Sequence, residues 1–131
     1  MVAAINELAG FDQVIAHFGH WPSFHDAIVE SFRIELKGDS VLQVRTWNTL
    51  PETDERGYFR TAQHGIVEFT MNQLSSFELG GSDLEAGCIL FGLGIEIDGE
   101  MYRLEFDPCL GIGGWLRCHS VSLSLRIPAE G

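Results

Sequence analysis

The chain has 131 residues, of which 45% are hydrophobic and 11% aromatic, and this composition is typical of one folded domain with a single core. Eight Lys and Arg residues stand against 19 Asp and Glu residues, which gives a formal net charge of −11 at pH 7. Because binding to nucleic acid or to an anionic membrane surface relies on Lys and Arg, this charge argues against both partners and favours a basic protein.

The cysteines and the N-terminal residues predict a cytoplasmic location. The odd number of cysteines, without a Cys-x-x-Cys pair, argues against a disulfide framework and a thiolate zinc site. Residues 1–9 carry Glu7 and no Lys or Arg, unlike a secretory signal. No apolar run approaches the ~20 residues that a membrane-spanning helix needs. The three cysteines are Cys88, Cys109 and Cys118.

The first expected element is an amphipathic helix. Gly10 divides its apolar pattern, so we expect the helix over residues 11–18, with Asp12 near its positive end and Gly19 at its end. The apolar residues that recur at steps of three and four are Ile5, Leu8, Phe11, Ile15 and Phe18.

A compact motif follows the helix. Pro22 fixes its own φ and forces Trp21 towards an extended conformation, so the chain is expected to turn there. Ser23 or Asp26 is expected to bond local backbone groups before the first strand. The motif spans residues 19–27 and contains Trp21, Pro22, Ser23, Phe24, His25 and Asp26.

The rest of the chain is predicted to be β-rich. Asp98-Gly99 is the strongest hairpin signal, because a tight primed turn needs residues that tolerate positive φ. Residues 50–63 are polar and are expected to form a long loop that carries binding residues. Strands are predicted over residues 28–37, 41–47, 66–71, 76–79, 89–97, 101–106 and 115–127.

These elements predict an α+β, mainly β, single domain over residues 1–131. One N-terminal helix precedes about seven mostly antiparallel strands, which form a bent sheet or a sandwich. The helix is expected to cover one face or one open edge of this sheet. Cys118 is expected to be a small buried hydrophobic residue of the last strand.

No catalytic motif stands out. His20, His25, Asp26 and His64 offer metal-ligand atoms, but their spacing matches no standard zinc site. The same residues suit a structural role in which His25 and Asp26 bond each other or nearby backbone. Ser23 with His25 lacks the Gly-x-Ser-x-Gly elbow of a serine nucleophile. We therefore expect no enzymatic activity, no cofactor and no metal.

Three parts of the chain carry a resemblance. Residues 19–27, with the alternating strand at residues 28–36, resemble the opening motif of the immunity protein 50 family, which is found beside polymorphic toxins in bacteria. A Gly-x-x-x-Phe-like patch at residues 64–69 is similar too, as is the Gly-Gly-Trp-Leu-Arg-Cys run at residues 113–118, whose strand ends at Pro128. The resemblance implies a non-enzymatic immunity protein that neutralises a toxin by occluding its active site.

The candidate contacts to a basic toxin come from charge and expected exposure. Glu52, Asp54 and Glu55 are the acidic residues of the expected loop. Trp47 and Tyr58 are candidate aromatic anchors at the protein surface. Two alternatives remain open: a small metal-dependent enzyme that uses the histidines above with Asp26, and a structural β domain that associates with itself as a homodimer.

Overall fold

The computed structural model describes residues 3–128, so residues 1, 2 and 129–131 of the expected domain lie outside the described part. The strands are β1 (Ile28–Arg33), β2 (Asp39–Thr53), β3 (Phe59–Gly80), β4 (Ile89–Asp98), β5 (Met101–Leu110) and β6 (Gly113–Arg126). The helices are η1 (Ile5–Glu7), α1 (Phe11–Phe18) and η2 (Leu84–Ala86). None of the helices in residues 3–128 is both long and apolar enough to span a bilayer.

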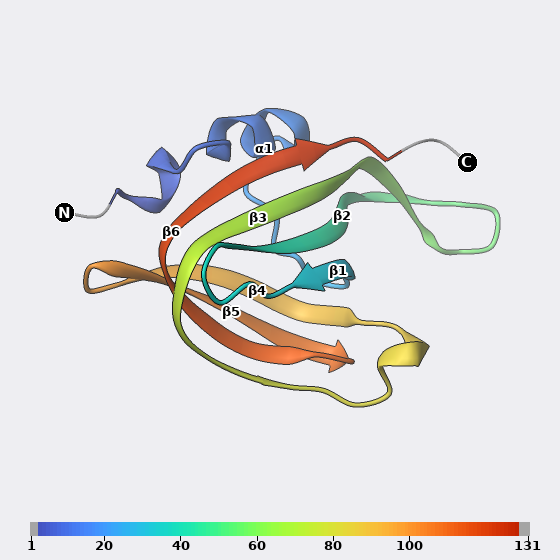
Figure 1. Ribbon diagram of the computed structural model, residues 1–131. Coiled ribbons are helices and arrows are strands. Elements are labelled where there is room, and N and C mark those ends of the chain that lie inside the picture. The colour runs from blue at the N-terminus through green and yellow to red at the C-terminus, as the bar shows by residue number, and fades with distance from the viewer. Residues whose placement is uncertain (1–2, 129–131) are drawn as a thin grey trace.

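The strands form one antiparallel sheet that curls into a closed barrel, in the order β1-β2-β3-β6-β5-β4 (Figure 1). This confirms the expected mainly β fold with one N-terminal α-helix, and the sheet is bent far enough to close. The described residues contain six strands instead of about seven, because the strands predicted at 66–71 and 76–79 are parts of one continuous β3. The predicted hairpin at Asp98-Gly99 is confirmed, since Asp98 faces Met101 across its turn.

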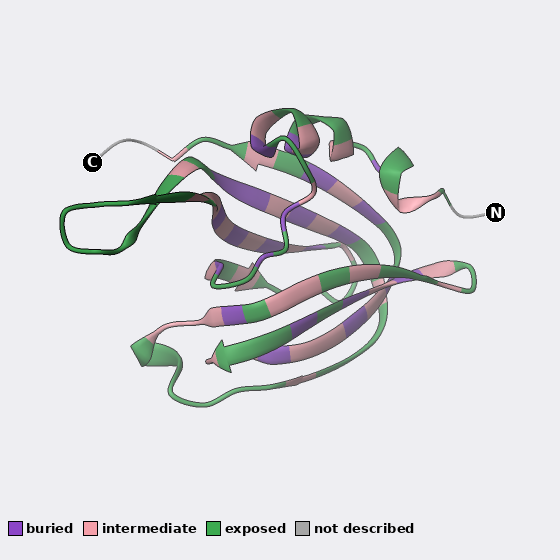
Figure 2. Cartoon of the chain, turned by 180° about the vertical axis from the view of Figure 1, so that it is seen from behind, coloured by how far each residue is buried: buried purple, intermediate pink, exposed green. Residues whose placement is uncertain are grey.

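The β2–β3 hairpin is much longer than the sequence predicted. Thr49 pairs with Thr61, and Thr53 pairs with Phe59, so only residues 54–58 connect the two strands. The prediction of a long loop over residues 50–63 is therefore wrong, because most of these residues belong to β2 and β3. Residues 49–61 form a two-stranded arm that projects from the barrel, and most of its side chains are exposed (Figures 1 and 2). Because both faces of the arm meet solvent, the arm lacks the apolar alternation that marks a half-buried strand.

Buried residues alternate with less buried ones along the strands (Figure 2), and the buried ones form the core. Leu42 of β2 and Phe69 of β3 are cross-strand partners, and both are fully buried. Burying a side chain of this size contributes about 1.5–3 kcal/mol. Cys118 is buried as expected, and this burial raises the pKa of its thiol from 9.0 to about 11.

Helix α1 lies against β6 (Figure 1). It begins after Gly10 and ends at Gly19, whose left-handed backbone donates its N–H to the carbonyl of Ile15. The helix buries Val14 and Phe18, whereas Ile15 is only half-buried. The predicted apolar face is confirmed at Phe18, and it left out Val14, which is buried more deeply than Ile15.

A short seam closes the barrel between β1 and β4. One ladder pair, Ile28 with Ile89, joins these two strands over the described residues. The residues just before β1 extend the seam, because the N–H of Asp26 donates to the Leu90 carbonyl at 2.9 Å and the N–H of Leu90 donates to the Ala27 carbonyl at 2.8 Å. The motif at residues 19–27 thus closes the sheet.

Candidate functional site: a groove beside the barrel seam

Some side chains of the motif are buried in the core, and others are exposed to solvent. Pro22 and Phe24 are buried, whereas Ser23, His25 and Asp26 are exposed. The Phe24 ring lies 5.7 Å from the rings of both Trp21 and Phe69, measured between centroids. The aromatic half of the motif therefore anchors the segment, and the polar half faces solvent beside the seam.

Two residues of the motif other than glycine have left-handed backbones. The φ angle is 60° at Phe24 and 63° at Asp26, and such a conformation costs a bulky residue about 1–3 kcal/mol. Burial of Phe24 and the seam hydrogen bond of Asp26 hold these conformations in place. As a result His25, which lies between the two, stands out from the barrel together with Asp26.

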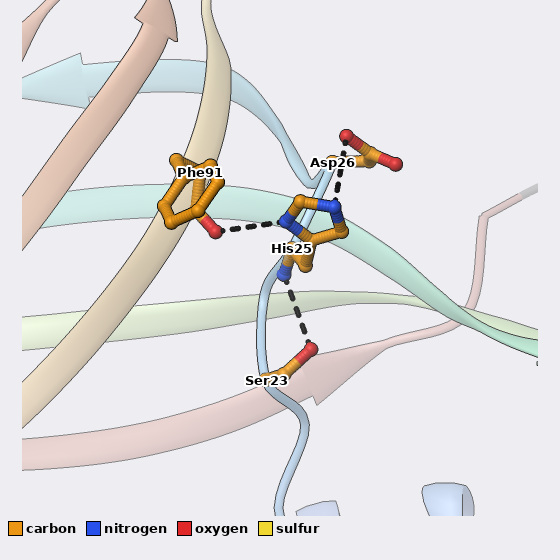
Figure 3. A network of polar contacts seen from close by, with 4 residues as sticks. All are labelled: Ser23, His25, Asp26 and Phe91. Carbon is orange, nitrogen blue, oxygen red and sulfur yellow. Dashed lines mark hydrogen bonds and ion pairs between the residues drawn. The ribbon is translucent and has the colours of Figure 1, made fainter.

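His25 is held by three polar contacts (Figure 3) and one ring contact. Its backbone N–H donates to Ser23 Oγ at 3.3 Å, and its Nδ1 lies 3.1 Å from the Phe91 carbonyl oxygen. Because a carbonyl oxygen only accepts, Nδ1 carries the proton in this contact. Nε2 faces Asp26 Oδ1 at 3.7 Å, and the Phe91 ring meets the imidazole edge-on at 5.2 Å. The His25 and Asp26 side chains remain 55% and 64% exposed.

These exposed side chains form one wall of a groove, and β2 forms the other. The groove has a volume of about 470 Å³, and no Lys or Arg lines it. We call it the seam groove. Its lining residues are His20, Pro22, Ser23, His25 and Asp26 from the motif, and Thr46, Trp47, Asn48, Thr49 and Leu50 from β2.

Asn48 ties the groove to the base of the arm. Its side-chain N–H groups donate to the Phe18 carbonyl at 2.8 Å and to Gln63 Oε1 at 3.2 Å. Its Oδ1 accepts from His20 Nε2 at 3.0 Å. One amide thereby connects the end of α1, the motif and β3, and fixes where the arm leaves the barrel.

Two further histidines support the same region. His17 of α1 places Nε2 at 3.1 Å from the Gln63 carbonyl and at 3.0 Å from the His64 carbonyl. His64 bonds Thr61 Oγ1 at 2.9 Å, and its ring stacks on Trp47 with 5.5 Å between centroids. Trp47, a predicted partner contact, therefore lies in the seam groove with its ring supported by His64.

The histidines do not converge as a metal site would require. His20 bonds Asn48 and the Trp21 carbonyl, His25 bonds Phe91, and His64 bonds Thr61. Within residues 3–128, no group of three or more His, Cys, Asp or Glu side chains is placed to hold a metal ion. The expected contact between His25 and Asp26 is present, at the length given above.

The acidic candidates lie at the end of the arm, away from the seam groove. The Asp54 carboxylate accepts backbone N–H groups of Arg56 at 2.8 Å and Tyr58 at 3.0 Å, so Asp54 orders the turn. Glu52 and Glu55 are exposed. Tyr58 is also exposed, at 69% of its surface.

The sequence pointed to Trp47 and the motif separately, and the fold brings them together in one groove. Asn48, Thr49 and Leu50 escaped sequence reasoning, because their role follows from the pairing of β2 with β3 and from closure at the seam. Comparisons with known proteins found no matching family model, no matching curated protein and no matching solved structure.

Proposed function

We propose that this protein is an immunity protein that binds a basic toxin of its own cell and neutralises it by covering the toxin's active site. The β2–β3 arm is the observation that carries the proposal. Tyr58 and Phe59 lie next to each other at its end and are 69% and 63% exposed. Exposed aromatic residues on a projecting element are typical of the anchors of a protein interface.

Charge supports a basic partner. The chain carries a net charge of −11, and the exposed Glu52 and Glu55 precede the aromatic residues of the arm, which also carries Arg56 and Arg60. Complementary charge raises the association rate and discriminates against wrong partners. The proposed site of action is the cytoplasm, where toxin and immunity protein are made together.

The resemblance to the immunity protein 50 family adds a second line of support. The residues that carry it, at 19–27, close the barrel and line the seam groove at the base of the arm. They therefore form part of the same exposed region from which the arm projects.

The test is co-expression with the candidate toxin that the adjacent reading frame encodes. We expect the wild-type protein to restore growth and to form a complex with the toxin that salt weakens. The variant Glu52→Lys/Glu55→Lys is expected to bind more slowly, and Tyr58→Ser/Phe59→Ser to dissociate faster. Growth arrest that persists in the presence of the folded wild-type protein overturns the proposal.

A matched control changes the net charge by the same amount as Glu52→Lys/Glu55→Lys, but away from the arm. Glu96 of β4 and Asp107 of β5 are exposed and lie on the β4–β5 hairpin. Glu96→Lys/Asp107→Lys is expected to leave toxin binding close to that of the wild type. Equal losses in the two double variants argue for an effect of net charge alone and against contact through the arm.

A further inference from the structure

We propose that the seam groove receives an arginine side chain of the partner protein, with the Asp26 carboxylate and the Trp47 ring as its two contacts. The inference rests on the proposed function and adds a second, chemically defined contact to it. The groove volume of about 470 Å³ lies within the range of ligand sites in proteins.

The charge of the groove selects a cation. Asp26 is the one carboxylate among the lining residues, and no Lys or Arg neutralises it there. The Asp26 carboxylate faces His25 Nε2 at 3.7 Å. Because His25 Nδ1 donates to the Phe91 carbonyl, Nε2 of the neutral ring carries no proton to offer Asp26. The carboxylate is 64% exposed, so it is open to a second partner.

The aromatic wall of the groove selects a planar cation. One face of the Trp47 ring is covered by His64, and the two rings are inclined by only 29°. A guanidinium stacks on an indole and also binds a carboxylate in the plane of its N–H groups, whereas an ammonium does neither as well. The same chain contains such a stack, because Arg103 Cζ lies 4.6 Å from the centroid of the Trp115 ring.

The groove is preorganised by hydrogen bonds within the protein. The seam hydrogen bonds fix the backbone at Asp26, and the neighbouring Asn48 is fixed by bonds to His20, Phe18 and Gln63. Little conformational entropy is therefore lost at these positions when a side chain enters.

The test uses blocked arginine, N-acetyl-arginine-N-methylamide, as a probe of the full chain in NMR titrations. We expect shifts at the indole N–H of Trp47 and at the amides of His25 and Asp26. Blocked citrulline, which has the same shape without the charge, is expected to bind much more weakly, and blocked lysine to bind less well than arginine.

Two variants test the contacts. Asp26→Asn is expected to weaken arginine binding about fivefold, because the loss of one exposed ion pair is worth about a factor of this size. Asparagine tolerates positive φ, so this variant keeps the backbone. Trp47→Leu is expected to weaken binding about threefold through loss of the cation–π contact. Glu85→Gln, which removes an exposed charge in η2, is the matched control and is expected to leave arginine binding unchanged.

The outcomes separate the groove from the proposed function. Equal binding of arginine and citrulline, shifts confined to other surfaces, or unchanged affinity in Asp26→Asn overturns the inference. If arginine binds at the groove but the toxin is not neutralised, the immunity function fails and the groove stands. If the toxin is neutralised equally by wild type and Asp26→Asn, the groove fails and the immunity function stands.

Discussion

Ile28 of β1 faces Ile89 of β4, and over the described residues this pair is the entire strand-to-strand ladder at the seam. Backbone hydrogen bonds of Asp26 and Ala27 to Leu90 continue the seam into the motif. The motif therefore has a structural role in addition to the proposed binding role, and mutations can separate the two.

Phe24 is expected to be the main stabilising residue of the motif. Phe24→Ala leaves a cavity beside Phe69 and should lower the free energy of unfolding by about 3–5 kcal/mol. Phe91→Ala removes a ring that is 61% exposed and should cost well under this amount. Urea denaturation of both variants measures the difference. Similar losses would show that Phe24 does not act through burial.

Substitution of Gly10 by alanine is expected to destabilise the protein more than the same substitution at Gly19. Both have left-handed backbones, with φ of 86° and 84°. A Cβ on Gly10 would stand 1.7 Å from the Leu123 carbonyl oxygen, whereas a Cβ on Gly19 meets nothing within 4 Å. Gly19→Ala should therefore cost about 1–2 kcal/mol, and Gly10→Ala clearly more because α1 must move away from β6. Thermal unfolding compares them, and equal costs would contradict the close approach.

Asn48 is expected to hold the base of the arm. Asn48→Ala removes the side-chain donor to the Phe18 carbonyl and one of the two polar contacts of the His20 ring, which should cost about 1–3 kcal/mol. Faster amide hydrogen exchange is expected at residues 61–64. Asn72→Ala removes an exposed hydrogen bond to Asp39 and serves as the control. Unchanged exchange at the arm base in Asn48→Ala would argue against this role.

Cys118 is expected to make stability fall at high pH. Burial raises the pKa of its thiol from 9.0 to about 11, so above pH 9 the unfolded chain loses this proton while the folded chain keeps it. The free energy of unfolding should fall between pH 9 and pH 11 by about 2–3 kcal/mol through this group, and below pH 9 the group has no such effect. The measurement is the difference between wild type and Cys118→Ala across this range. A constant difference contradicts the raised pKa.

The sequence was most informative where burial leaves a pattern. The helix at residues 11–18 and the turn at Asp98-Gly99 were predicted correctly, because apolar spacing and turn chemistry are local signals. The arm was missed because its two strands, in which Thr49 pairs with Thr61, are exposed on both faces. Strands that pair without burying one face show no alternation of apolar and polar residues. The seam groove depends on closure between β1 and β4, which no local pattern encodes.

The position of the seam in the sequence also bears on when the seam groove forms during folding. The β2–β3 and β4–β5 hairpins join strands that are neighbours in sequence, whereas Ile28 pairs with Ile89, which lies 61 residues further along the chain. Contacts of such long sequence separation carry a high loop-closure entropy and slow the folding of β topologies. We therefore expect the seam to form after these hairpins, so that a chain without the seam would not hold His25 and Trp47 on facing walls of one groove.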